Sequence, residues 1–81
     1  MKAYPNPTSG YISVDLMGYT EGGAQIEILD LTGRIVQRTQ QKLIDGYNTL
    51  ELDMSNLSSG LYLVRIKDSD NHEAVVRVSK M

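Results

Sequence analysis

Short segments in which apolar and polar residues alternate run along most of this chain. From Tyr11 to Leu16 the apolar side chains occupy every second position, and Ala24 to Ile28 repeats that spacing. A period of two is typical of β-strands that bury one face against a core. The pattern therefore predicts strands over 11–16 and 24–28, with a loop over 17–23 between them.

The second half of the chain continues this succession of strands and turns. Asp30 to Gly33 reads as a tight hairpin turn, because Asp accepts backbone hydrogen bonds and Gly adopts positive φ at low cost. The segment after this turn is polar enough to predict a strand at a sheet edge. Leu61 to Lys67 carries apolar residues on both faces, which predicts a central strand. The other predicted elements are strands over 34–40, 47–53 and 73–79, turns at 45–46 and 68–71, and a crossover over 53–59 whose Met54 and Leu57 close one end of the core.

No stretch of the sequence shows sustained helical periodicity. Short strands with turns at near-regular spacing predict an all-β fold, a small antiparallel β-sandwich of two sheets. The chain has 81 residues, of which 41% are hydrophobic, enough for one compact domain. We expect a single domain over 1–81, with residues 1–9 as a proline-containing entering segment.

The charge and residue usage exclude several function classes. The formal net charge is −2 and there is no cysteine, which argues against general nucleic-acid binding and excludes disulfides and thiolate metal sites. No apolar run approaches the roughly 18 residues of a transmembrane helix, so no membrane insertion is expected. The N-terminus lacks a signal-peptide pattern, which indicates a domain cut from a longer chain. We expect a monomer, with an edge-mediated dimer as the alternative.

The residues that carry chemistry form no reaction centre in the sequence. His72 is the only histidine and lies beside a predicted turn, and no serine has the context of a nucleophile. We therefore predict no catalytic residue, no cofactor and a solvent-facing His72. Asp68, Asp70, Asn71 and Glu73 offer oxygen ligands, but their spacing departs from a calcium loop and fits a hairpin loop better.

Four short motifs occur in a fixed order and together resemble a known family. Tyr4-Pro5-Asn6-Pro7-Thr8-Ser9-Gly10 opens the chain and Asp30-Leu31-Thr32-Gly33-Arg34 follows; the run from Leu52 to Ile66 then contains Ser59-Gly60-Leu61-Tyr62, and Val75-Val76-Arg77-Val78-Ser79-Lys80 closes it. In order and spacing they resemble the type A C-terminal sorting domain of the type IX (Por) secretion system. The resemblance runs from Tyr4 to Lys80. It implies an immunoglobulin-like sandwich of about seven short strands.

The resemblance also implies a function and a set of partners. Such domains end cargo proteins of Bacteroidetes-type bacteria and direct them from the periplasm across the outer membrane to the cell surface or medium. The implied partners are an N-terminal cargo domain, the outer-membrane translocon or its shuttle protein, and a surface sortase that usually removes the domain. The implied role is non-enzymatic. Strand edges that accept an added strand would serve this recognition.

The matching motifs supply the candidate recognition residues. Pro5 and Pro7 cannot donate ladder hydrogen bonds, which suits a sheet edge. We expect Gly10 and Gly60 to adopt positive φ before their strands. The Tyr62 ring is expected to pack in the core while its hydroxyl reaches the backbone. The full candidate set is Pro5, Asn6, Pro7, Gly10, Gly60, Tyr62, Arg77, Val78 and Lys80.

The last strand is the strongest recognition candidate among these segments. Arg77 and Lys80 are expected to place charge along a terminal strand, where charge also discourages unplanned edge pairing. We expect substitutions at Arg77, Val78 and Lys80 to leave the fold largely intact while trapping cargo in the periplasm.

An accessory module beside a secreted enzyme is the alternative function. The same sandwich would serve as a spacer or bind glycan, because fold alone does not determine function. For glycan binding the candidate residues are Tyr11, Tyr19 and Tyr47.

Overall fold

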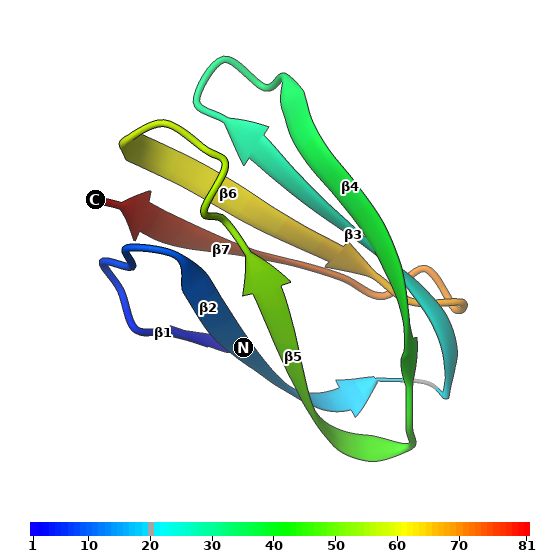
Figure 1. Cartoon of the computed structure of the whole chain (residues 1–81). Coiled ribbons are helices and arrows are strands. Elements are labelled where there is room, and N and C mark those ends of the chain that lie inside the picture. The colour runs from blue at the N-terminus through cyan, green and yellow to red at the C-terminus, as the bar shows by residue number, and fades with distance from the viewer. Residues whose placement is uncertain (20) are drawn as a thin grey trace.

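The computed structural model describes residues 1–19 and 21–81, which form two β-sheets packed face to face (Figure 1). One sheet has three strands in the order β1-β2-β5, and the other has four in the order β4-β3-β6-β7. All pairings between these strands are antiparallel. The strands are β1 (Lys2–Tyr4), β2 (Tyr11–Tyr19), β3 (Gly22–Asp30), β4 (Ile35–Leu43), β5 (Gly46–Asp53), β6 (Gly60–Lys67) and β7 (Glu73–Lys80). The predicted all-β sandwich is confirmed.

An aliphatic core fills the space between the sheets. Met54 and Leu57, from the crossover between β5 and β6, pack against it as predicted. The chain has neither Phe nor Trp, and among the described residues Tyr62 is the one aromatic member of the core. The described part of the chain contains no helix long and apolar enough to cross a membrane. The remaining buried core residues are Ile12, Val14, Leu16, Ala24, Ile26, Ile28, Leu43, Leu50, Leu52, Val64, Ile66 and Val78.

The hairpin between β3 and β4 has the predicted turn chemistry. Asp30 Oδ1 accepts hydrogen bonds from the Thr32 hydroxyl at 2.6 Å and from the N–H groups of Thr32 and Arg34, each at 3.0 Å. Gly33 has a φ of +89° and donates its N–H to the Asp30 carbonyl at 3.0 Å. These hydrogen bonds, the Thr32 hydroxyl first, hold the pKa of Asp30 below its ordinary value.

The strand boundaries differ from the sequence prediction in several places. β4 continues three residues past the predicted 34–40, to Leu43. The predicted loop over 17–23 is wrong: β2 continues to Tyr19, where it pairs with Gly46, and β3 begins at Gly22. A register shift between Met17 and Tyr19 accommodates Gly18 (φ +84°), so the glycine marks a bulge and not the strand's end. Thr20, also in that loop, lies outside the described residues. Inside the predicted entering segment, β1 adds a short edge strand.

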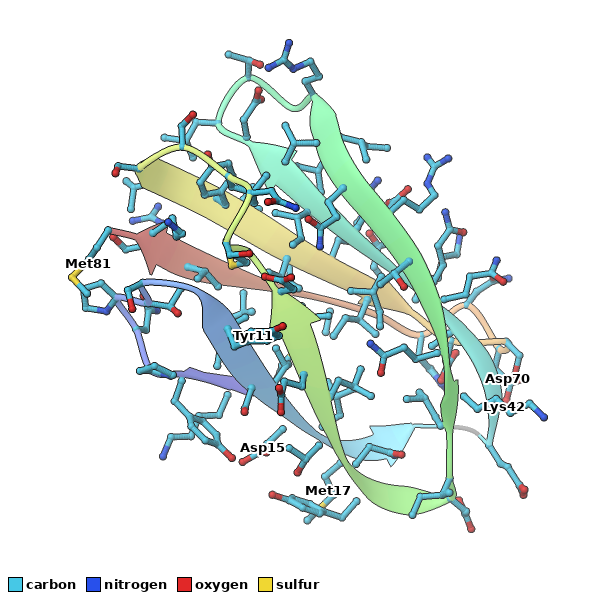
Figure 2. The ribbon with its side chains drawn as sticks, in the orientation of Figure 1. Tyr11, Asp15, Met17, Lys42, Asp70 and Met81 are labelled. Atoms are coloured by element: carbon cyan, nitrogen blue, oxygen red, sulfur yellow. The ribbon has the colours of Figure 1, made fainter. Side chains whose placement is uncertain are left out.

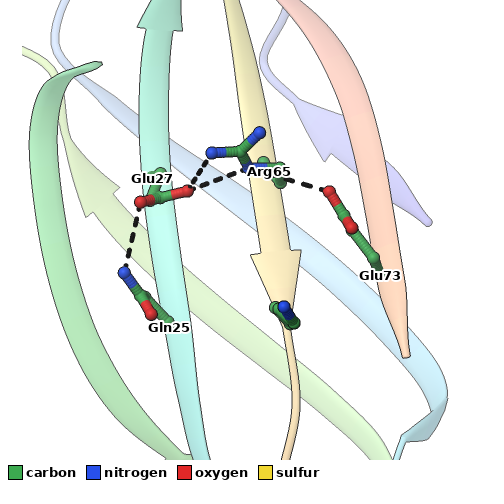
Figure 3. Close-up of a pocket in the computed structure, with 5 residues that line it drawn as sticks. Gln25, Glu27, Arg65 and Glu73 are labelled. Atoms are coloured by element: carbon green, nitrogen blue, oxygen red, sulfur yellow. Dashed lines mark hydrogen bonds and ion pairs between the residues drawn. The ribbon is translucent and has the colours of Figure 1, made fainter. Parts of the chain in front are cut away.

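The predicted places of β4 and β6 in the sheet are confirmed. β4 is an edge strand, and β6 lies between β3 and β7. On the outer face of this sheet, Glu27 of β3 is nearly buried and contacts both neighbouring strands. Figure 3 shows its contact with Arg65 of β6. Its carboxylate accepts from Arg38 Nη2 at 2.9 Å and from Arg65 through Nε at 2.9 Å and Nη2. The ion pairs join three strands across the sheet.

The environment of Glu27 favours its charged form. The hydrogen bonds from Arg65 are the largest influence and, with those from Arg38, they outweigh burial, so the pKa of Glu27 lies below its ordinary value. A carboxylate with a lowered folded-state pKa stabilises the protein above its unfolded pKa. This stability is lost as the pH falls through the folded-state pKa.

Replacement of Glu27 tests this electrostatic contribution. We expect Glu27→Gln to lower the free energy of unfolding at pH 7 by about 1–2 kcal/mol, because charged hydrogen bonds become neutral ones. The variant should also lose less stability than the wild type between pH 7 and pH 3. Part of the acid loss should remain, since the pKa values of Asp30 and Asp53 are lowered too. Thermal unfolding followed by circular dichroism across this pH range measures both effects.

Glu51→Gln is the matched control, because Glu51 is exposed on the outer face of the other sheet, opposite Ser13. The control should follow the wild-type pH curve. An equally steep acid loss in Glu27→Gln and the wild type would contradict the role given to Glu27.

Candidate functional site

The opening motif and the last strand lie side by side, although they stand at opposite ends of the sequence (Figure 1). Thr8 donates its N–H to the carbonyl of Ser79 at 2.9 Å, and Met81 donates its N–H to the carbonyl of Thr8 at 2.8 Å. Thr8 and Lys80 form a parallel β-bridge. The segment therefore extends the four-stranded sheet beside the end of β7.

Asn6 strengthens this contact with both ends of its side-chain amide. Its Nδ2 donates to the carbonyl of Arg77 at 3.1 Å, and its Oδ1 accepts from the N–H of Ser79 at 2.9 Å. A side-chain amide here takes the place of a neighbouring strand's backbone. Pro5 and Pro7, which flank Asn6, are exposed. We call these contacts of Asn6 and Thr8 with residues 77–81 the terminal seam.

Thr8 is a buried polar residue that the sequence analysis missed. Its hydroxyl donates to the carbonyl of Tyr11 at 2.6 Å and accepts from the N–H of Gly10 at 3.2 Å. The available signal was the Thr-Ser-Gly sequence, because hydroxyl residues stabilise turns in this way. Gly10 does not have the expected positive φ. Its carbonyl instead accepts from the N–H of Met54 at 2.9 Å, which attaches the β5–β6 crossover.

Tyr62 and Gly60 behave as their sequence context predicts. The Tyr62 ring is buried, and its hydroxyl donates to the carbonyl of Ser58 at 2.6 Å. This bond ties β6 to the loop before it, so the polar end of the ring is satisfied. Gly60 has a φ of +155°, as expected of a glycine at the start of this strand.

The candidate residues of the last strand divide between its two faces. Arg77 is exposed, whereas Val78 has no exposed surface and belongs to the core. Lys80 is also buried, and its Nζ donates to the main-chain oxygen of Met81 at 3.0 Å. The expectation that substitution of all three leaves the fold intact is therefore wrong. Lys80 also does not protect the edge with an exposed charge, because it lies on the inward-facing side of β7.

Part of the β7 edge remains open beyond the terminal seam. The seam occupies the N–H and carbonyl of Ser79 and the carbonyl of Arg77, all directed away from β6. Backbone groups alternate along a strand, so the N–H of Arg77 and both groups of Val75 point the same way. Among the described residues these groups have no hydrogen-bond partner. The open segment includes residues 75–77.

The acidic loop between β6 and β7 is organised by Asp68. Its carboxylate accepts from the N–H groups of Asp70 and His72 at 3.0 and 2.8 Å, and it lies 2.9 Å from His72 Nδ1. The imidazole is largely exposed, which confirms the prediction for His72. Within the described residues no three His, Cys, Asp or Glu side chains are arranged to hold a metal ion.

The exposed tyrosines Tyr11 and Tyr47 do not share one platform. Tyr11 pairs with Asp53 at one end of the β2–β5 ladder, and Tyr47 pairs with Met17 at the other end (Figure 2 labels Tyr11 and Met17). Six residues of strand separate the two positions, about 20 Å. The side chain of Tyr19 lies outside the described part of the chain. The outer face of the other sheet has a shallow pocket lined by Gln25, Glu27, Arg65, Lys67 and Glu73 (Figure 3).

Comparison with known proteins identifies the family. No match was found among curated proteins. The family model described as secretion system C-terminal sorting domain matches residues 2–80, nearly the whole chain. This family is non-catalytic, is recognised by the secretion machinery and belongs to secreted proteins. The chain therefore belongs to the C-terminal sorting domains of the Por (type IX) secretion system.

Proposed function

We propose that this sorting domain carries an N-terminal cargo domain from the periplasm across the outer membrane. The outer-membrane translocon or its shuttle protein recognises the folded domain. A surface sortase then removes it, which leaves the cargo at the cell surface or in the medium. Family membership supports this sequence of events, and the open edge of β7 supplies its physical basis.

The open backbone groups of Val75 and Arg77 are the observation that carries the proposal. An edge strand with free N–H and carbonyl groups is a template for an added strand. The terminal seam occupies the C-terminal end of this edge, which leaves the stretch around Val75 and Arg77 for a partner strand. Strand addition depends on backbone groups that only the folded domain presents in this order.

The candidate residues then act in two ways. Arg77 lies at the open edge and meets the partner directly. Asn6, between Pro5 and Pro7, holds the opening segment against β7 and so shapes the edge. The remaining candidates act through the fold: Gly10, Gly60, Tyr62, Val78 and Lys80.

An export assay tests the function itself. A periplasm-directed fluorescent reporter joined to the N-terminus of the chain should reach the surface or medium of a bacterium with type IX machinery. It should stay in the periplasm of a translocon-deficient sibling, and a sortase-deficient sibling should retain the uncut fusion. Retention in the periplasm of the competent strain, with the domain folded, would reject the proposal.

Proline at position 75 tests strand addition. Val75→Pro removes the outward N–H that a partner strand needs while leaving the ladder to β6 unbroken, since proline is tolerated at strand edges. We expect secreted reporter to fall at least about tenfold. Val75→Ile, which keeps the N–H and an apolar β-branched side chain, is the matched control and should be exported normally. Equal export of the two variants, both folded by circular dichroism, would exclude this edge as the pairing site.

Tyr62→Phe separates a structural role from recognition. Loss of the hydrogen bond to the Ser58 carbonyl should lower the free energy of unfolding by about 1 kcal/mol, because this partly buried bond has no replacement within the protein. Export should remain at the wild-type level, since the hydroxyl faces the protein. Urea denaturation and the export assay measure the two effects. Wild-type stability combined with lost export would instead place Tyr62 in the recognition surface.

A further inference from the structure

Apolar side chains line up across the outer face of the four-stranded sheet. Ile35 of β4 is opposite Leu29 of β3, Leu29 is opposite Leu63 of β6, and Leu63 is opposite Arg77 of β7. Their neighbours along the strands, Ile28, Val64 and Val78, belong to the core. Since side chains alternate between faces, this row lies on the outer side of the sheet. Within it Leu29 is only 9% exposed and Leu63 is half-buried.

Exposed apolar residues adjoin the row on both sides. Leu61 of β6 is 42% exposed and Val75 of β7 is 53% exposed. Ile35 is 37% exposed at the edge. Single apolar residues at the surface need no explanation, but a contiguous group on neighbouring strands marks an interaction site. We call this group the leucine–arginine face: Leu29, Ile35, Leu61, Leu63 and Val75 with the flanking Arg38, Arg65 and Arg77.

The charge of this sheet face is opposite to that of the chain. Glu27 and Glu73 are its acidic residues by register, and both lie within ion-pair distance of Arg65. Five of the eight Lys and Arg residues stand on it, so five basic against two acidic side chains give +3, whereas the chain as a whole carries −2. No ion pair among the described residues involves Arg77 or Lys67. The five are Arg38, Lys42, Arg65, Lys67 and Arg77.

The outer face of the three-stranded sheet offers a contrast. Its register places three acidic side chains outward, Asp15, Glu51 and Asp53, and one basic side chain, Lys2. The net charge of this face is therefore −2. Asp15 already accepts hydrogen bonds from Tyr4 and Thr49. The two sheet faces therefore differ in the sign of their charge, and only one combines positive charge with a leucine row. Exposed apolar side chains occur on both, because the three-stranded face carries Tyr4, Tyr11, Met17 and Tyr47.

We infer that the leucine–arginine face is the docking surface for an acidic protein partner of the export machinery. The inference rests on the proposed function. It adds which surface of the domain the partner binds and which chemical groups bind it. The leucine row binds apolar side chains of the partner, and Arg77 and Lys67 attract carboxylates around them. Charge complementarity brings the partner to this face, and burial of Leu61 and Val75 retains it.

Paired variants on the two faces test this inference in the export assay. Leu61→Thr and Arg77→Glu alter the leucine–arginine face, and Tyr47→Thr and Lys2→Glu make matched changes on the opposite sheet. We expect secreted reporter to fall about tenfold for each of the first two, because one lost apolar or ionic contact is worth about that factor. The two controls should be exported like the wild type.

Substitutions at Arg77 test the sign of the partner's charge. Arg77→Lys should retain export, Arg77→Gln should reduce it, and Arg77→Glu should reduce it most. The unfolding temperature of each purified variant should lie within a few degrees of the wild-type value. The losses of export are then due to weaker binding and not to unfolding. Equal export of the Arg77→Lys and Arg77→Glu variants would overturn the inference that the partner is acidic.

The remaining outcomes separate the inference from the proposed function. Normal export of the wild type together with both face variants would overturn the inference and leave the sorting function intact. Failure of the wild-type fusion would reject both. A second copy of the chain is the competing occupant of this face. Concentration-dependent association that Arg77→Glu abolishes in sedimentation, with export unchanged, would also overturn the inference.

Discussion

The pairing of β3 with β6 is the constraint on which the rest of the sandwich depends. Its register runs from Gln25 opposite Lys67 to Asp30 opposite Tyr62, in the middle of the four-stranded sheet. A shift of one residue would turn every inward side chain outward. Glu27 reinforces the correct register, because it meets Arg65 only in this alignment and would enter the aliphatic core in the shifted one. Burial and charge thus select the same pairing.

The sequence predicts those elements that are determined by local pattern. Alternation was sufficient for the strand that begins at Tyr11 and for the central strand β6, and turn chemistry was sufficient for the hairpin at Asp30. Local pattern fails where a glycine lies inside a strand, as Gly18 does, because the bulge depends on the pairing with β5. It also fails for buried polar residues. Thr8 and Lys80 are buried by contacts between the two ends of the chain, and no local pattern contains such contacts.

The terminal seam explains why the first and last motifs belong together. Asn6 and Thr8 bond to the backbone of Arg77 and Ser79, so the contact depends on the position of β7 more than on its side chains. Asn is required for its amide geometry, since one group donates and the other accepts. Neither motif shows this relation in its own sequence. The folded chain combines two segments separated by some seventy positions into one edge.

Alternate positions of a single motif serve different purposes here. In the run that forms β6, Tyr62 and Val64 face the core and contribute to stability, whereas Leu61 and Leu63 face outward. The inward positions must be apolar for the sheets to pack. The outward positions are under no such requirement, because polar residues on a solvated sheet face cost little. The fold alone therefore accounts for Tyr62 and Val64, whereas the exposed Leu61 is available to the acidic partner that we infer for this face.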